Sequence, residues 1–504
     1  MSPTVRPNDS TALYKSKRSL AAIIALVLAS AFAVAQAGDP PIGESASTIS
    51  DLTPMENPDV QASIRLFSAW LEGQIAQREL PGIVVGLVKG DDLIWSKGFG
   101  YADLSNKRPM TDDTRFRMAS HSKLFTATAI MQLREKGLLR LDDPVSDYLP
   151  WFEFKTATAD DPAVTVEHLL THSSGLPREA GTHWSDYEFP TKKELQALLP
   201  ERQAAFSPEV RWKYSNLAYA LAGMIVETVS GQSWPAYLQD NIFDPLAMSA
   251  SSVDAEDPQL ATGYGRRIPN QEREVMPFVD ARSMSSATGL TSTIEDMAAF
   301  VSAQFREGPR GDNRILSTAS LREMHRVRML ENDWTRGQGI GFSVMRVGDK
   351  LQVGHGGGYP GYTTHTRIQL DDEIGAIVLT NTLDSYPSQL SAQLMETVGT
   401  AVAKATKTDS EKRWDPEWAR FAGIYRSPWG DFQVVEMNEE LVLININAPR
   451  LKIRSTLEPL TGDTFVIKAE TGGGPVGEVT RFVEENGRVT RMINGDSYME
   501  RIDP

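Results

Sequence analysis

The sequence predicts a large α/β domain, built as an antiparallel sheet flanked by helices, followed by a small all-β domain. Three observations lead to this prediction. The large domain opens with a helical pattern and two strand-like runs joined by a tight turn. A polar, charged stretch at residues 404–413 reads as a linker, and short strand-like runs follow it. A chain of 504 residues is also too long for one compact core of the usual size.

Residues 1–37 have the order of a secretory signal peptide. Three basic residues within 15–18 precede an apolar run at 20–34, and Ala-Gln-Ala at 35–37 supplies the small residues that a signal peptidase reads. The apolar run is shorter than the roughly 20 residues of a membrane-spanning helix, so we expect cleavage rather than an uncleaved anchor. We therefore expect a periplasmic or secreted protein that is not stably inserted in a membrane. Residues 38–57 read as a flexible lead-in.

The large domain is expected over residues 58–403. Hydrophobic spacing predicts its opening helix at residues 60–78, and Val-rich and Ile-rich runs predict strands at 83–89 and 93–98. Further helical patterns lie at residues 123–136, 217–230, 293–304 and 388–403, and two more strands are expected within 366–379.

The small domain is expected over residues 414–504. Its strand-like runs lie at residues 432–435, 441–446, 464–467, 479–483 and 489–492, separated by turn residues. Two roles stay open for this domain: a stabilising appendage, or a lid that shapes substrate access.

The composition excludes several classes of function. The formal net charge of -15 repels phosphate backbones, so we expect no nucleic-acid partner. The absence of cysteine excludes disulfides, cysteine nucleophiles and thiolate metal sites. His168 and His172 have the spacing of a metal-binding pair on a helix, but no glutamate follows the first histidine as in H-E-x-x-H. We therefore expect buried, hydrogen-bonded histidines at these positions, and neither a metal site nor a cofactor.

Ser120 and Lys123 form an S-x-x-K pattern at the start of the helix expected at residues 123–136. Residues three apart lie on one face of a helix, so both side chains would point the same way from its first turn. A lysine amine beside a serine hydroxyl can take its proton and activate the oxygen as a nucleophile. Taken alone, the pattern also fits a serine cap followed by a solvated lysine.

Two further segments offer complementary chemistry. Tyr214 and Asn216 form a Y-x-N pattern just before the helix expected at residues 217–230. A phenol near a lysine can work as a general acid or base, and an asparagine amide can hold a substrate carbonyl or the lysine. Residues 354–358 read Gly-His-Gly-Gly-Gly, and glycines let a backbone approach a ligand closely and expose its N–H groups. On its own, this segment also fits an ordinary glycine loop.

The three patterns occur in the order S-x-x-K, Y-x-N and H-x-G, and S-x-x-K chemistry is typical of β-lactamases and penicillin-binding proteins. Together they resemble the β-lactamase-related serine hydrolases, which include class C β-lactamases, DD-peptidases, esterases and D-amino-acid amidases. The resemblance covers roughly residues 60–403 through HLLTHSSGLP at 168–177, YSNLAYALAGMIVETVSG at 214–231, ATGLTSTIEDMAAF at 287–300 and HGGGYPGY at 355–362. No G-x-S-x-G occurs, which disfavours an α/β-hydrolase.

The resemblance implies an α/β sandwich with a mostly helical subdomain, and an active site between the two parts. The C-terminal domain resembles the small β-barrels attached to some of these hydrolases. Ser120 would attack the acyl carbon, while Lys123 and Tyr214 would manage the proton. Which of these two side chains is the general base stays open.

The resemblance implies binding roles for the remaining candidates. Asn216 would orient Lys123 or the substrate amide, and His355 would line the pocket. The glycines Gly357 and Gly358 would bring the backbone close to the substrate, with the Gly358 N–H holding the oxyanion together with that of the nucleophile. Gly356 departs from the pattern, because many penicillin-recognising relatives have Thr or Ser there to help grip a substrate carboxylate.

We therefore expect an exported hydrolase that cleaves an ester or amide bond of a small molecule or peptide through an acyl-Ser120 intermediate. Two alternatives stay open. One is a β-lactamase or DD-carboxypeptidase that acts on β-lactams or peptidoglycan, and the other is a sensor that binds such molecules without catalysis. The natural substrate and the oligomeric state are left open by the sequence.

Overall fold

The computed structural model describes residues 53–502, apart from 180, 182, 306–314, 332, 349, 407–414, 429, 438–439, 447–453 and 470–475. The predicted signal peptide, most of the lead-in and most of the linker lie outside the described residues, so these boundaries stay predictions. The helices are α1 (Pro58–Arg78), α2 (Ser122–Glu135), α3 (Val145–Tyr148), α4 (Val166–Leu170), α5 (His183–Asp186), α6 (Lys192–Leu198), α7 (Asn216–Ser230), α8 (Trp234–Leu238), α9 (Ser285–Thr288), α10 (Ile294–Ser302), α11 (Thr318–His325), α12 (Pro387–Leu394) and α13 (Thr400–Thr406).

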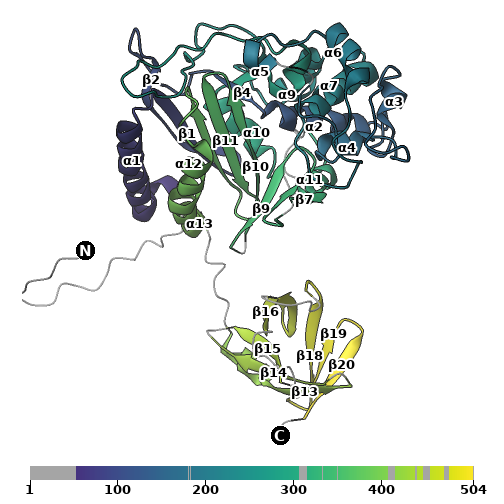
Figure 1. Ribbon diagram of the computed structural model, residues 1–504. Helices are drawn as coiled ribbons and strands as arrows, with labels where there is room; N and C mark the ends of the chain where they lie inside the picture. The colour runs from purple at the N-terminus through teal and green to yellow at the C-terminus, as the bar shows by residue number, and fades with distance from the viewer. Residues whose placement is uncertain are drawn as a thin grey trace, which may run out of the picture. The chain divides into compact units, whose positions relative to one another are not determined.

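Nine strands form one antiparallel sheet in the order β3-β2-β1-β12-β11-β10-β9-β8-β7 (Figure 1). The strands are β1 (Gly82–Lys89), β2 (Asp92–Asp103), β3 (Arg108–Pro109), β7 (Met329–Leu330), β8 (Arg336–Gln338), β9 (Ser343–Val347), β10 (Lys350–Tyr359), β11 (Tyr362–Gln369) and β12 (Ile374–Thr380). Strands from the two ends of the domain meet in the sheet, with Val85 of β1 opposite Val378 of β12. The predicted antiparallel sheet flanked by helices is confirmed.

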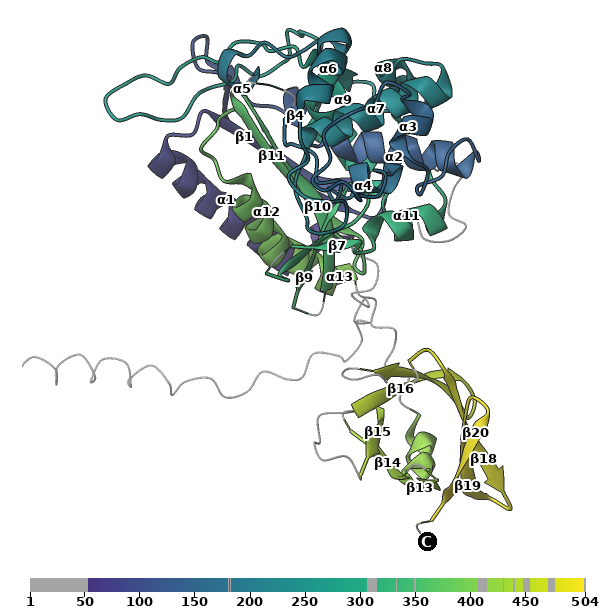
Figure 2. The same cartoon turned by 45° about the vertical axis from the view of Figure 1, so that its right-hand side comes forward.

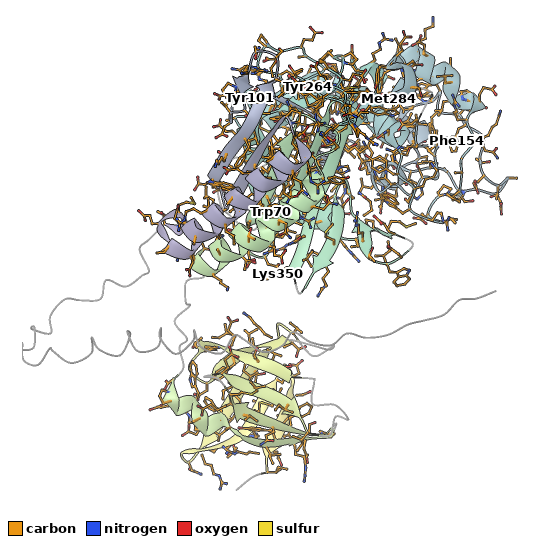
Figure 3. All side chains as sticks on the ribbon, turned by 60° about the vertical axis from the view of Figure 1, so that its left-hand side comes forward. Trp70, Tyr101, Phe154, Tyr264, Met284 and Lys350 are labelled. Carbon is orange, nitrogen blue, oxygen red and sulfur yellow. The ribbon has the colours of Figure 1, made fainter. Side chains whose placement is uncertain are left out.

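The sheet separates two hydrophobic cores. On β1, Ile83 and Val85 belong to the core that includes residues of α1, α12 and α13, whereas Val84 belongs to the core shared with α2, α7 and α10. Helices α1 and α12 lie on one side of the sheet, and α2 and α7 lie on the other (Figure 2). This alternation follows from the period of two in a strand. On α1 the ring of Trp70 lies 5.8 Å from that of Phe67, at the margin of the first core (Figure 3).

The helical subdomain occupies the chain between β4 (Phe116–Ala119) and β6 (Leu290–Ser292), which pair with each other, and β6 also pairs with β5 (Ser252–Val253). Small residues let its helices approach closely. A Cβ at Gly223 of α7 would lie only 2.2 Å from Ser286 Oγ of α9. This tight packing fixes α9, whose carbonyl groups reach the active site.

Two local expectations need correction, and one open alternative is resolved. The glycine-rich segment at residues 354–358, which on its own also fitted a loop, belongs to strand β10. The helix expected at residues 388–403 is α12 and α13 joined by a π-helical turn at Met395–Gly399. Ser120 lies in a turn just before α2 rather than on its first turn.

The C-terminal strands close into an eight-stranded antiparallel barrel. They are β13 (Gly423–Ser427), β14 (Gly430–Glu436), β15 (Leu441–Asn445), β16 (Arg454–Thr461), β17 (Thr464–Ala469), β18 (Val479–Glu485), β19 (Arg488–Asn494) and β20 (Ser497–Arg501). Pairing of Tyr425 with Arg501 closes the ring, and aromatic side chains such as Phe465 and Phe482 fill its core. The predicted all-β domain is confirmed, and the entry strand expected at residues 421–425 corresponds to β13, although β16 and β20 were not among the expected strands. No helix in the described part of the chain is both long and apolar enough to cross a membrane.

Candidate active site

The backbone around Ser120 is held in a sharp turn. Ala119, the last residue of β4, has a left-handed φ of 52°, which is unfavourable for a residue with a Cβ and is often retained at functional sites. The Ser122 hydroxyl stabilises this turn, because it donates to the Ala119 carbonyl (2.7 Å) and accepts from the Leu290 N–H (2.9 Å). These contacts fix the position of Ser120 between the strand and α2.

The structure brings three of the predicted catalytic side chains together. Ser120 Oγ lies 3.1 Å from Lys123 Nζ and 2.8 Å from the Tyr214 hydroxyl, which donates to it. Lys123 Nζ also donates to the Ala287 carbonyl of α9 at 2.8 Å. The serine hydroxyl therefore has two groups within hydrogen-bond reach that can exchange a proton with it.

Burial gives the lysine and the tyrosine different protonation states. Lys123 is fully buried, and this burial holds the pKa of its amine well below the usual value, although the charge of Glu179 raises it in part. Burial also raises the pKa of the Tyr214 phenol above its ordinary value. A depressed amine pKa and a raised phenol pKa favour a neutral amine beside a protonated phenol.

Residues from distant segments position Tyr214. Its ring lies 4.3 Å from that of His172, whose Nδ1 accepts a hydrogen bond from the Ser215 N–H at 3.2 Å. Ser215 begins α7 as its N-cap and accepts from the Ala218 N–H at 3.0 Å. The segment at residues 168–177 thus supports the phenol without contacting the serine.

Asn216 makes a contact that the sequence did not suggest. Its amide nitrogen donates to Glu179 Oε1 at 2.6 Å, and among the described residues its buried amide oxygen has no hydrogen-bond partner. Burial raises the pKa of Glu179, but hydrogen bonds from His183, Trp184 and Asn216 outweigh this effect and leave the pKa below its ordinary value. The described hydrogen bonds therefore link Asn216 to an anionic carboxylate rather than to Lys123.

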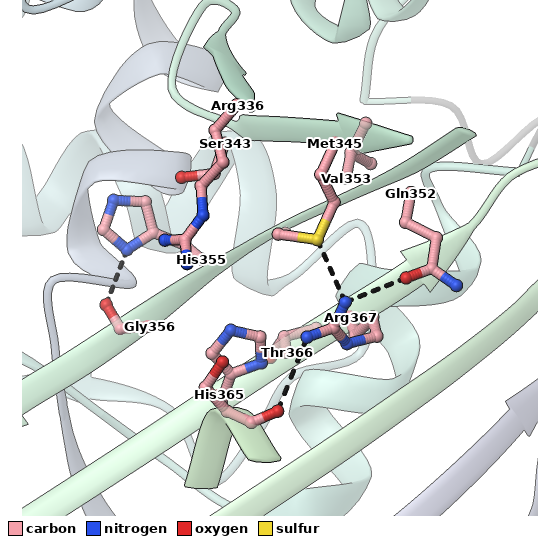
Figure 4. Close-up of a pocket in the computed structure, with 12 residues that line it drawn as sticks. Arg336, Ser343, Met345, Gln352, Val353, His355, Gly356, His365, Thr366 and Arg367 are labelled. Atoms are coloured by element: carbon pink, nitrogen blue, oxygen red, sulfur yellow. Dashed lines mark hydrogen bonds between the residues drawn. The ribbon is translucent and has the colours of Figure 1, made fainter. Parts of the chain in front are cut away.

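His355 is a neutral histidine at the edge of the site. Burial lowers its pKa to about 3. Its Nδ1–H donates to the Gly356 carbonyl at 2.6 Å, which leaves Nε2 as a hydrogen-bond acceptor (Figure 4). His355 can therefore accept a hydrogen bond from a substrate, but it carries no positive charge at neutral pH.

The two predicted oxyanion-site glycines have different packing. A Cβ at Gly357 would lie 2.3 Å from Thr364 Oγ1 and 2.4 Å from the Met118 carbonyl, so only glycine lets β10 approach β4 this closely. A Cβ at Gly358 would have no neighbour within 4 Å. Gly358 and Ser120 line the same cavity, which is where two N–H groups would have to converge on an oxyanion.

That cavity has a volume of about 540 Å³. It is lined by Ser120, Arg178, Trp212, Tyr214, His355, Gly356, Gly357, Gly358, Thr363, Thr364, His365, Pro387, Ser388 and Gln389. The sequence analysis did not identify Arg178, whose guanidinium lies 5.0 Å from the centre of the Tyr214 ring. Arg178 directly follows the segment at residues 168–177, and this position in the sequence could have suggested it as a site residue.

The histidine pair considered for a metal is hydrogen-bonded within the fold. His168 Nδ1 accepts from the Thr165 N–H at 3.1 Å in the first turn of α4, and His172 supports Tyr214 as described. Within the described ranges, no three His, Asp or Glu side chains are grouped to hold a metal ion.

Comparison with known proteins places this site in a family. The family model described as Beta-lactamase matches residues 67–395, which contain all the site residues discussed above. The chain belongs to the beta-lactamase family. It is a serine hydrolase of that family, and its large domain has the corresponding fold.

Two proteins whose names indicate different activities are similar to this chain. Penicillin-binding protein 4* of Bacillus subtilis (strain 168) is 29% identical over 312 residues, covering 58% of this chain and 66% of that protein. Esterase EstB of Burkholderia gladioli is 33% identical over 213 residues, covering 40% of this chain and 54% of the esterase. The chain thus matches between half and two thirds of the length of these relatives.

Among solved structures, the octameric penicillin-binding protein homologue from Pyrococcus abyssi has a TM-score of 0.59 at 26% identity, covering 86% of this chain and 99% of that one.

Proposed function

We propose that this protein is an exported hydrolase that cleaves an ester or amide bond through an acyl-Ser120 intermediate. The proposal rests on the serine oxygen lying 3.1 Å from Lys123 Nζ and 2.8 Å from the Tyr214 hydroxyl. Such short distances suit a nucleophile whose proton is passed to neighbouring groups during attack.

In the proposed acylation, Ser120 Oγ attacks the acyl carbon while its proton moves to the neutral amine of Lys123. The N–H groups of Ser120 and Gly358 receive the negative charge of the tetrahedral intermediate. The bond to the leaving group then breaks as the Tyr214 phenol gives that group its proton, and the lysine ammonium restores the proton of the phenol. Water reverses the sequence to release the acid. Lys123 is the base in this scheme because burial favours its neutral form and the protonated form of Tyr214.

An ester or amide substrate is proposed ahead of a β-lactam because residue 356 is glycine. No hydroxyl is present there to bind a carboxylate beside His355. Similarity to Esterase EstB supports this choice, whereas similarity to Penicillin-binding protein 4* supports the second candidate, a hydrolase of β-lactams or peptidoglycan.

Intact-mass measurements test the proposal. The purified protein is incubated with p-nitrophenyl butyrate and, separately, with benzylpenicillin, and the Ser120→Ala variant serves as the control. We expect nitrophenol release and an acyl adduct from the ester, both absent in the variant. A stable adduct with benzylpenicillin alone would favour the penicillin-binding alternative. Hydrolysis that persists unchanged in Ser120→Ala would refute the assignment of the nucleophile.

Export is proposed from the basic, apolar and small-residue order of residues 1–37. Cleavage after Ala37 would give a mature chain that begins at Gly38. N-terminal sequencing of protein from the periplasm or medium checks this, and an intact Met1 in that fraction would contradict it.

A further inference from the structure

A second cavity, of about 220 Å³, lies against strand β10 next to the catalytic cavity (Figure 4). It is lined by Arg336, Ser343, Met345, Gln352, Val353, Gly354, His355, Gly356, His365, Thr366, Arg367 and Ser388. Two of these side chains are arginines, and none is an aspartate or glutamate. This cationic cavity is not used by the proposed acylation chemistry.

The cationic cavity and the catalytic cavity adjoin at one edge of β10. Strand β9 pairs with β10 only from Lys350 to Gly354, whereas the pairing of β10 with β11 continues to Tyr359. The edge of β10 that faces away from β11 is therefore open beyond Gly354. Both cavities are lined by His355, Gly356, His365 and Ser388. A substrate bound at Ser120 can thus extend over this open edge.

Arg367 is the buried cation of this cavity. Its side chain comes from β11 and is only 7% exposed. One terminal nitrogen donates to Gln352 Oε1 at 2.9 Å, and the other reaches the Ser388 carbonyl at a long 3.4 Å. Its Nε has no hydrogen-bond partner among the described residues. A buried guanidinium without a carboxylate is costly, so the site is electrostatically suited to an anion.

Arg336 supplies a second positive charge from a different strand, β8 (Figure 4). Its side chain is exposed, and the nearby carboxylate of Asp333 has its pKa lowered mainly by hydrogen bonds from Thr335 and also by the charge of Arg336. Burial lowers the pKa of Arg367, and the charge of Arg336 lowers it further, so the two cations repel each other. An anion between them would remove this repulsion.

The neighbouring histidines add no charge to the cationic cavity. Burial lowers the pKa of His365 well below its ordinary value, and that of His355 to about 3, so both are neutral at neutral pH. Gly356 lines both cavities and presents no side chain to either of them. The charge facing a ligand therefore comes from the two arginines.

We propose that Arg336 and Arg367 bind a carboxylate at the far end of the substrate whose ester or amide bond is cleaved at Ser120. This inference rests on the proposed function and adds a substrate class to it, namely half-esters or half-amides of dicarboxylic acids and related chains that end in a carboxylate. A guanidinium presents a planar fork that matches a carboxylate.

Binding measured without turnover separates this inference from the proposed function. The Ser120→Ala variant is titrated by calorimetry with monomethyl succinate, monomethyl glutarate and monomethyl adipate, and with the corresponding neutral dimethyl esters. At least one half-ester should bind roughly 10-fold to 100-fold more tightly than its dimethyl ester, which is the range for hydrogen bonds to charged groups. The length series identifies the span between the two cavities.

The Arg336→Gln substitution, added to Ser120→Ala, should abolish the preference for the half-ester. Because Arg336 is exposed, this variant should fold, and Arg367→Met is a second variant whose fold is checked by thermal unfolding. The matched control is Arg346→Gln, which removes the same charge from an exposed position on the neighbouring strand β9, outside the cavity lining. The control should keep the preference.

Equal binding of half-esters and dimethyl esters would overturn the inference, even if the protein hydrolyses neutral esters. Tighter binding of inorganic phosphate than of every half-ester would overturn the assignment of a carboxylate. With Ser120 restored, hydrolysis of the preferred half-ester should exceed that of its dimethyl ester by the same factor in kcat/KM. A clear binding preference without any hydrolysis would instead contradict the proposed function and leave the anion site in place.

Discussion

Replacing Tyr214 by phenylalanine removes one hydroxyl from the active site and leaves the ring in place. That hydroxyl donates to Ser120 Oγ at 2.8 Å and is the proposed proton donor to the leaving group. Loss of a positioned proton donor slows a reaction by about 10² to 10⁴. At 1.36 kcal/mol for each factor of ten, kcat/KM should therefore reflect a loss of about 2.7–5.4 kcal/mol in transition-state stabilisation.

The expected effect of Tyr214→Phe on stability is much smaller. One neutral hydrogen bond contributes about 0.5–1.5 kcal/mol to the free energy of unfolding. Tyr219→Phe is the matched control, because the Tyr219 hydroxyl is buried nearby but donates to the Leu170 carbonyl at 2.6 Å instead. This control should lose about 1–3 kcal/mol of stability, since it leaves a buried carbonyl without its donor, and should retain the wild-type rate.

The assay is the hydrolysis of p-nitrophenyl butyrate, combined with urea unfolding of both variants and the wild type. We expect Tyr214→Phe to lose much of its kcat/KM and little of its free energy of unfolding, and Tyr219→Phe to show the reverse. A Tyr214→Phe enzyme within about tenfold of the wild-type kcat/KM would exclude the phenol as an important proton donor. Equal rate losses in the two variants would show that packing, rather than proton transfer, limits the reaction.

Two further predictions concern β10. His355 has a pKa of about 3 in the folded protein, below its value of about 6.5 in the unfolded chain. Between these pH values the unfolded chain binds a proton that the folded chain does not. The free energy of unfolding therefore falls as pH falls from about 6.5 towards 3. His355→Gln should reduce the slope of the unfolding free energy over that range by up to about 1.4 kcal/mol per pH unit in urea titrations, and an unchanged slope would contradict this. Gly357→Ala should lose about 1–3 kcal/mol of stability because its Cβ would collide with the Met118 carbonyl, whereas the matched Gly358→Ala should not. Equal melting temperatures for the two alanine variants would refute the packing argument.

Much of the large domain could be predicted from local patterns. Val60, Ile64, Phe67 and Leu71 are all buried on one face of α1, as their helical spacing indicates. The alternation along β1 likewise reflects its position between two cores. Such patterns are visible in a sequence because each records which face of one element is buried.

Strand β10 shows where this reasoning stops. Its segment at residues 354–358 contains four glycines and a histidine, so it has no hydrophobic alternation to detect. The segment forms a strand because its backbone pairs with β11, and Met118 and Thr364 approach residue 357 too closely for a side chain there. The reason for glycine there is therefore a tertiary contact.

The sequence by itself indicated the residues that we propose carry the chemistry. Ser120 and Lys123 are three residues apart, so their spacing suggested the pair, although the contact of Ser122 with the distant Leu290 helps to hold the turn that carries Ser120. The order of the three motifs then indicated Tyr214 as a partner, and the family comparison agrees with that reading of the chain as a serine hydrolase.

Only the tertiary structure decided the protonation states and the neighbours of these groups. The partnership of Asn216 with Glu179 and the meeting of Arg336 with Arg367 join segments that no local pattern connects. The pKa of Lys123 is low because distant helices remove its amine from water. Burial of a charge depends on the whole surrounding fold, and for that reason the sequence could name the lysine but could not assign its charge.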